Sequence, residues 1–212
     1  SEDFVEKLRG LGLVDITTAG WEPSEEDRQL LLDIESLAKA AEFLKNFRAG
    51  ERCDAAAAPF ASGEEAYAHY AAAHREAATL NAEIGRLEKA AEELRPWGAF
   101  DVEATRKLAA RGIVLRYFFT QRNTFDKQLA EWSRYTVSEV SRTDAMVWFV
   151  VVAKPGEEVT LDAQEMKTPT MDIREAERRI AEAEGKLRTL DAEFSRAAAS
   201  EALLAQHACS LK

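Results

Sequence analysis

The sequence predicts an α+β protein in which a long antiparallel two-helix coiled coil carries a distal α/β lobe. Two heptad-spaced stretches of similar length predict the coil, and an aromatic and β-branched segment between them predicts the lobe. A shorter α/β piece ahead of both predicts a partial proximal lobe at the base. The 212 residues are 46% hydrophobic with a net charge of −10, which excludes general disorder and a wholly nucleic-acid-binding surface.

The first 62 residues are expected to form the base of the molecule. Residues 1–23 are expected to form the partial proximal lobe. A short helix is expected from the spacing of Phe4, Val5, Leu8 and Leu11, and a strand over Leu13–Thr18. Residues 24–62 predict a base helix and a connector, in which Ser24 is the helix N-cap and Pro59 prevents a continuous helix. The apolar stripe of the base helix consists of Leu30, Ile34, Leu37, Ala41 and Leu44.

Two long helices are expected at residues 63–95 and 172–206, followed by a tail at 207–212. The outgoing seam steps alternately by three and four residues and ends before Pro96; it contains Tyr70, Ala73, Ala77, Leu80, Ile84, Leu87, Ala91 and Leu94. The returning seam follows the candidate N-cap Asp172 with the same steps, through Ile173, Ala176, Ile180, Ala183, Leu187, Leu190, Phe194 and Ala197. Two equal seams that flank one lobe pair most simply with each other, and their alanines favour a close approach.

Residues 96–171 are expected to fold as the distal lobe, with a ferredoxin-like arrangement. A first helix begins behind Asp101 and ends at Gly112, and a second covers Thr124–Trp132. Three strands are expected over Ile113–Phe119, Tyr135–Val140 and Met146–Val152. The last of these is apolar on both faces, so it should be central in its sheet. The longest apolar run has nine residues, whereas a bilayer span needs about 20.

The sequence contains no phosphate-binding loop, zinc-protease motif or nucleophile elbow, so we expect no catalytic residue, metal or cofactor. His69 and His74 lie five residues apart, which suits solvated side chains better than a metal pair. Cys53 and Cys209 fit no metal spacing and are expected to be free thiols. The stretch 116–119 is typical of strands that stack RNA bases and also of sheets that bury their aromatics; we favour burial.

Charge is unevenly distributed along the chain. Residues 95–156 contain ten basic and six acidic residues, whereas the rest of the chain contains eighteen and thirty-two. This distribution predicts a mildly basic lobe on an acidic coil, and hence docking of the lobe on an acidic partner. Chance surface composition is the alternative explanation.

Several sequence segments resemble bacterial V-type ATPase subunit I, the counterpart of eukaryotic subunit a. They are residues 4–37, the segment Leu-Arg-Pro-Trp-Gly at 94–98 followed by Phe100 and Asp101, and the expected strands at 114–119 and 150–152. In that family Pro-Trp-Gly sits where the outgoing coil enters the distal lobe. A strand that usually precedes Phe4, a returning proximal segment and the membrane domain are missing, so we expect this chain to be the cytosolic arm of a longer protein.

The resemblance implies a non-catalytic stator arm on the cytoplasmic side of the membrane, the soluble part of a membrane complex. It implies contacts with the E and G peripheral-stalk subunits and with other stator or central-stalk subunits. The full-length protein would lie in the membrane beside the rotor ring and take part in ATP-coupled ion or proton transport. Candidate contact residues in the lobe, chosen by charge alone, are Arg106, Arg111, Arg122, Lys127 and Arg134.

The alternative is a coiled-coil nucleic-acid arm of the seryl-tRNA synthetase kind. Such an arm should be basic, and the coil predicted here is strongly acidic, so we expect no nucleic-acid partner. A small-molecule enzyme in the lobe is a third reading, with no motif behind it.

Overall fold

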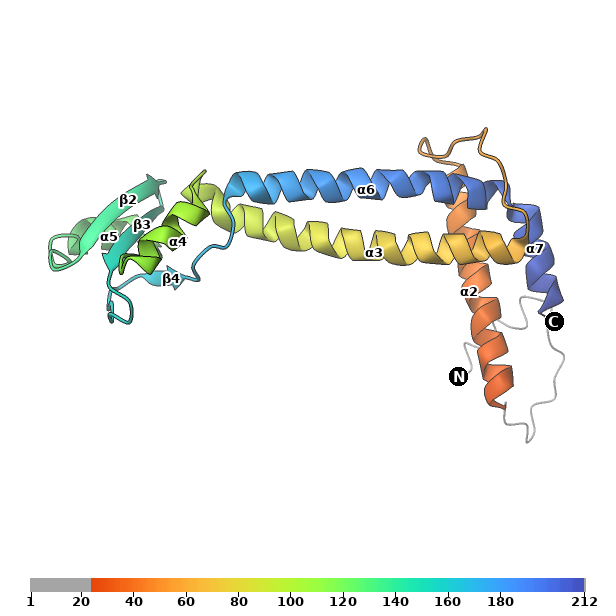
Figure 1. Ribbon diagram of the computed structural model, residues 1–212, viewed down its shortest axis with the longest axis horizontal. Helices are drawn as coiled ribbons and strands as arrows, with labels where there is room; N and C mark the ends of the chain where they lie inside the picture. The colour runs from red at the N-terminus through yellow and green to blue at the C-terminus, as the bar shows by residue number, and fades with distance from the viewer. Residues whose placement is uncertain (1–23, 212) are drawn as a thin grey trace. The chain divides into compact units, whose positions relative to one another are not determined.

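The structure is a computed structural model that describes residues 24–211 (Figure 1). The strand and short helix expected within residues 1–23 lie outside the described residues. The chain divides into a first unit, formed by the residues before Ala71 and after Phe194, and a second unit formed by Ala71–Phe194. No helix of the described part is both long enough and apolar enough to cross a bilayer.

The first unit contains α2 (Glu25–Arg48), which begins at a capping box. The Ser24 hydroxyl accepts a hydrogen bond from the Asp27 amide, and the Asp27 carboxylate accepts one from the Ser24 amide. The buried stripe consists of Leu37, Ala40, Leu44 and Phe47. The prediction that Ala41 belongs to this stripe is wrong, because Ala41 is exposed and Ala40 is buried. Helical spacing from Leu37 and Leu44 allows either alanine, and the buried Phe47 continues the stripe that contains Ala40.

The returning helix, expected over 172–206, is two helices in the structure: α6 (Ile173–Ala199) and α7 (Glu201–Ser210). Buried Ser200 stands at the break, where its hydroxyl accepts the Phe60 amide at 2.8 Å and donates to the Arg196 carbonyl. No glycine or proline marks this break in the sequence. The connector that contains Phe60 is therefore fixed to the end of α6 by a hydrogen bond across 140 residues.

The second unit contains most of α3 (Gly63–Leu94) and α6, which lie antiparallel to each other (Figure 1). Every predicted seam position in both helices is buried or half-buried, which confirms the heptad prediction. Where the helices reach the lobe, the seam forms a cluster of Ala91, Leu94 and Ala176, with Met171, Ile173 and Ile180 packed on it.

The lobe contains an antiparallel sheet of β1 (Val114–Gln121), β2 (Thr136–Arg142), β3 (Met146–Ala153) and β4 (Gln164–Met166). The strand order is β2-β3-β1-β4, and α5 (Arg122–Gln128) connects β1 to β2 with β3 between them. This split β-α-β arrangement confirms the ferredoxin-like prediction, with a loop in place of the helix between β3 and β4. The sequence did not predict β4, whose three residues show no apolar alternation.

β3 is a central strand, as its composition predicts. On one face its buried side chains meet α5 in the lobe core, which consists of Phe118, Phe125, Trp132, Val147, Phe149 and Val151. The second helix of the lobe ends at Gln128, earlier than the expected Trp132, yet Trp132 remains in the core and stacks on Phe149 at 5.4 Å. On the other face lie η1 (Arg95–Trp97) and α4 (Val102–Ala110). Asp101 caps α4 and Gly112, at φ 82°, follows its end, as predicted.

Candidate functional site at the junction of the helix pair and the lobe

The outgoing crossing from helix pair to lobe is a short, closely packed turn. α3 passes into η1, where Pro96 and Trp97 stand, and the turn ends at Gly98 with φ 66° and ψ −155°. A side chain at that φ is strained, so glycine suits the position. Trp97 is buried, and its indole meets the Tyr117 ring edge-on, with centroids 5.1 Å apart. The turn thereby fixes the end of α3 to the middle of β1.

The return crossing is held by Asp172, the predicted N-cap of α6. One carboxylate oxygen accepts the Glu175 amide at 3.0 Å; the other accepts the Phe100 amide at 3.2 Å and the Arg174 guanidinium at 2.9 Å. Burial raises the pKa of Asp172, but these hydrogen bonds outweigh burial, and its pKa lies below the ordinary value. A single carboxylate therefore joins the chain leaving the helix pair to the chain returning to it.

Tyr117 completes the junction on the sheet. It is buried, which raises the pKa of its phenol, while a hydrogen bond with Thr105 of α4 acts in the opposite direction. The Phe100 ring lies 6.2 Å from the Tyr117 ring. Trp97, Phe100 and α4 thus converge on one tyrosine of β1, so the lobe is attached through its sheet and not through a loop alone.

The short strand β4 is held by an ion pair between Arg116 and Glu165. The guanidinium donates to both carboxylate oxygens at 2.6 Å and to the Glu157 carbonyl at 2.9 Å. The Arg116 hydrogen bonds outweigh burial and lower the pKa of Glu165. No local pattern predicts this pair, because its members lie 49 residues apart.

The presence of β4 changes the charge of the lobe. The segment after Gly156 contributes Glu157, Glu158, Asp162 and Glu165, which the stretch 95–156 left out. Residues 96–171 contain ten basic and ten acidic residues. The lobe as folded is therefore neutral, and the expectation of a mildly basic lobe is wrong.

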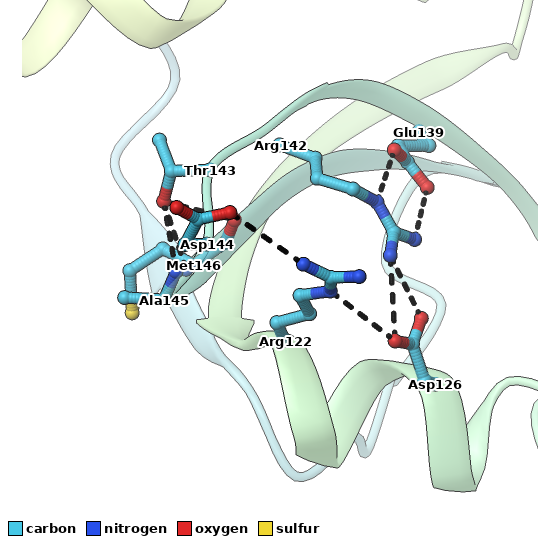
Figure 2. A network of polar contacts seen from close by, with 8 residues as sticks. All are labelled: Arg122, Asp126, Glu139, Arg142, Thr143, Asp144, Ala145 and Met146. Atoms are coloured by element: carbon cyan, nitrogen blue, oxygen red, sulfur yellow. Dashed lines mark hydrogen bonds and ion pairs between the residues drawn. The ribbon is translucent and has the colours of Figure 1, made fainter.

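A network of charged side chains ties α5 to the β2–β3 hairpin (Figure 2). Arg142 donates to both oxygens of Glu139 at 2.8 Å and to Asp126 at 3.1 Å. Arg122 lies 3.7 Å from Asp126 and 3.8 Å from Asp144. The hydrogen bonds that Arg142 donates lower the pKa of Glu139, and their acceptance by Glu139 and Asp126 raises the pKa of Arg142. The predicted contact residue Arg122 is thus already engaged inside the lobe.

The other predicted contact residues lie in different settings. Arg106 pairs with Glu103 at 3.5 Å, and the Arg134 guanidinium lies 4.8 Å from the centre of the Tyr135 ring. Arg111 and Lys127 are exposed and make no ion pair with any residue between 24 and 211. The five remain predicted contacts, now with their surroundings known.

These basic residues do not form one patch, because α4 and α5 cover opposite faces of the sheet. Tyr117 and Phe118 are consecutive in β1, so their side chains leave opposite faces. Tyr117 meets Thr105 of α4, whereas Phe118 stacks on Phe149, which contacts Phe125 of α5. Arg106 and Arg111 therefore belong to one face, and Arg122 and Lys127 to the other.

The described residues contain no group of three or more His, Cys, Asp or Glu side chains placed to hold a metal ion. Cys53 and Cys209 are free, as expected. Asp172, Arg116 and Arg142 each stand in a separate cluster of polar side chains, and each is paired with an oppositely charged residue of its own cluster. Their chemistry is that of fixing elements in place.

Comparisons with known proteins found matches among solved structures. No family model matches the chain, and no curated protein matches it. One of the matching structures is the cytoplasmic N-terminal domain of subunit I, a homologue of subunit a, of V-ATPase, with 18% sequence identity and a TM-score of 0.40. The match covers 98% of this chain and 85% of that chain. That domain belongs to the family that the stretches 4–37 and 94–98 resemble.

Proposed function

We propose that this chain is a non-catalytic stator arm of a rotary V-type ATPase. The observation that carries the proposal is the junction at Trp97 and Asp172, which fixes a folded lobe to the end of a helix pair at both chain crossings. The phrase at 94–98, which resembles subunit I, consists of the residues that build the outgoing crossing. An arm that transmits force needs such a fixed joint.

The helix pair suits a mechanical role. α3 has 32 residues and α6 has 27, which at about 1.5 Å per residue correspond to about 48 and 40 Å. Their seam side chains are buried or half-buried, so bending the pair requires separation of apolar contacts. A load on the lobe would pass through Trp97 and Asp172 into both helices.

In this proposal the lobe contacts the end of a peripheral stalk made of E and G subunits. The rest of the protein would hold the membrane domain beside the rotor ring, on whose cytoplasmic side this chain would lie. The complex would use the arm to resist rotation during ATP-coupled ion transport, and the arm itself would transform no substrate.

A capture experiment with purified E–G heterodimer from the same source tests the proposal. The immobilised chain should retain E–G at low ionic strength, and an unrelated two-helix coiled coil should not. Transfer RNA serves as the second probe and should give no mobility shift. Failure to retain E–G at low salt, where charge contacts are strongest, would overturn the proposal.

A further inference from the structure

One end of the lobe sheet exposes apolar side chains beside α4. Ile113 is 40% exposed and Val152 is 37% exposed. Leu115 pairs with Val152, and Ile113 stands two residues before Leu115, so all three belong to the face that carries Tyr117. Leu108 of α4 is half-buried, and its carbonyl accepts the Ile113 amide at 3.0 Å. We name these four residues, Leu108, Ile113, Leu115 and Val152, the Ile113 patch.

α4 leaves this part of the face incompletely covered. None of its nine residues is buried, although Val102, Thr105 and Leu108 are half-buried against the lobe. Covering this apolar strip with a further element removes apolar surface from water, which lowers the free energy of the complex.

Three cations surround the patch. Lys107 lies in α4 and Arg111 caps its C-terminal end four residues later, while Lys154 follows Ala153, which pairs with Val114. All three are exposed and make no ion pair with the residues that the structure describes. Arg106, the remaining cation of α4, pairs with Glu103. The patch thus has an apolar centre and a rim whose positive charges lack partners, which is the anatomy of a protein interface.

The apolar side chains of the patch project from the face of the sheet. β3, which carries Val152, lies between β1 and β2, whereas β4 pairs with β1 only at Tyr117–Phe119, beyond the patch. A partner that covers the patch therefore makes its apolar contacts with side chains on the face. A helix presents an apolar stripe at spacings of three and four residues with charged side chains on either side, and it fits such a strip.

We infer that the Ile113 patch docks a partner helix whose apolar stripe is flanked by Asp and Glu. The inference rests on the proposed function and adds to it the face of the lobe and the chemistry of the stalk segment. It assigns contacts to Arg111 and to Lys107, which complement acidic side chains, and none to Lys127 on the opposite face.

Matched substitutions on the two faces test the inference, with binding of purified E–G heterodimer as the readout. Ile113→Asp should weaken binding about tenfold or more, whereas Leu129→Asp, at a side chain 43% exposed, should leave it unchanged. Lys107→Glu with Arg111→Glu should weaken it similarly, and Lys127→Glu should not. Circular dichroism should show that all variants keep the wild-type helix content.

The outcomes separate the inference from the proposed function. Wild-type chain that binds E–G, with the loss confined to the α4-face variants, supports both. Wild-type chain that binds E–G with no loss in those variants, or with loss only in the Leu129 and Lys127 variants, overturns the inference and leaves the stator proposal standing. Wild-type chain that does not bind E–G contradicts both. An α4-face dependence seen with transfer RNA in place of E–G would overturn the acidic-helix assignment.

Discussion

The Asp172 carboxylate accepts a hydrogen bond from the Phe100 amide, across 72 residues of chain, while it caps α6. The same carboxylate binds the Arg174 guanidinium. This hydrogen bond joins the start of the lobe segment directly to its end. The attachment of lobe to helix pair therefore depends on a few identifiable atoms, and each can be tested.

Asp172→Asn should lower the free energy of unfolding by about 2 kcal/mol, because one acceptor oxygen becomes an NH2 group that faces the Phe100 amide. The control, Asp101→Asn, should cost about 0.5 kcal/mol or less, since Asn also caps well and the Asp101 carboxylate accepts only the Ala104 amide among the described residues. Denaturant titration measures both. Equal effects would contradict a special role for Asp172.

The pH dependence of the Asp172→Asn effect follows from its lowered pKa. A carboxyl with a lower pKa in the folded state stabilises the protein above the unfolded pKa of about 3.9, and loses that contribution as pH falls through the folded value. The difference between wild type and Asp172→Asn should be full at pH 7 and fade below about pH 4. A difference that grew on acidification would contradict the assignment.

Trp97→Ala should destabilise the chain by about 3–5 kcal/mol, because it empties a buried site against Tyr117. Trp97→Phe should cost less, since it keeps an aromatic ring and since no described residue accepts a hydrogen bond from the buried Trp97 indole. A double-mutant cycle with Tyr117→Leu should show coupling between the two rings. Additive effects would show that the edge-on contact contributes nothing specific.

Glu165→Gln should loosen β4 without unfolding the lobe. The Arg116–Glu165 pair is partly exposed, so we expect a loss of about 1 kcal/mol or less in global stability. Hydrogen exchange should nevertheless accelerate at the β4 amides. Glu158→Gln, at an exposed acid of the same loop, is the control and should leave exchange unchanged. Equal exchange in both variants would show that the ion pair does not hold β4.

Two glycines of α3 should respond oppositely to alanine. A Cβ at Gly63 would lie 2.1 Å from the Leu203 carbonyl oxygen of α7, so Gly63→Ala should destabilise the protein by more than about 1 kcal/mol. A Cβ built at Gly85 meets no described atom within 4 Å beyond its own turn of α3, so Gly85→Ala should stabilise the helix by about 0.5–1 kcal/mol. Thermal unfolding measures both, and a stabilised Gly63→Ala would contradict this packing of α3 on α7.

Local patterns in the sequence predicted much of the fold. The seams, the caps at Asp101 and Asp172 and the central position of β3 follow from spacing and composition within one element. Features that depend on residues far apart in the sequence could not be predicted from such local patterns. Ser200, at the break in the returning helix, is bonded to Phe60, and β4 is held on β1 by strand pairing and by the Arg116–Glu165 pair.

The candidate contact residues show the same division. Charge along the chain selected five basic residues, yet the acids after Gly156, which fold into the lobe, make it neutral, and Arg122 is engaged in an internal network. Which cations lack a partner depends on the sheet register and on which face each helix covers. Sequence alone gave no means to separate Arg111 from Arg122.

Calorimetric titration of this chain with purified E–G heterodimer tests the central claim most directly. The stator account predicts one-to-one binding with a Kd of about 1 µM or tighter at low ionic strength, weakening as salt is added. Absence of binding by a chain whose circular dichroism shows the helices intact would contradict it.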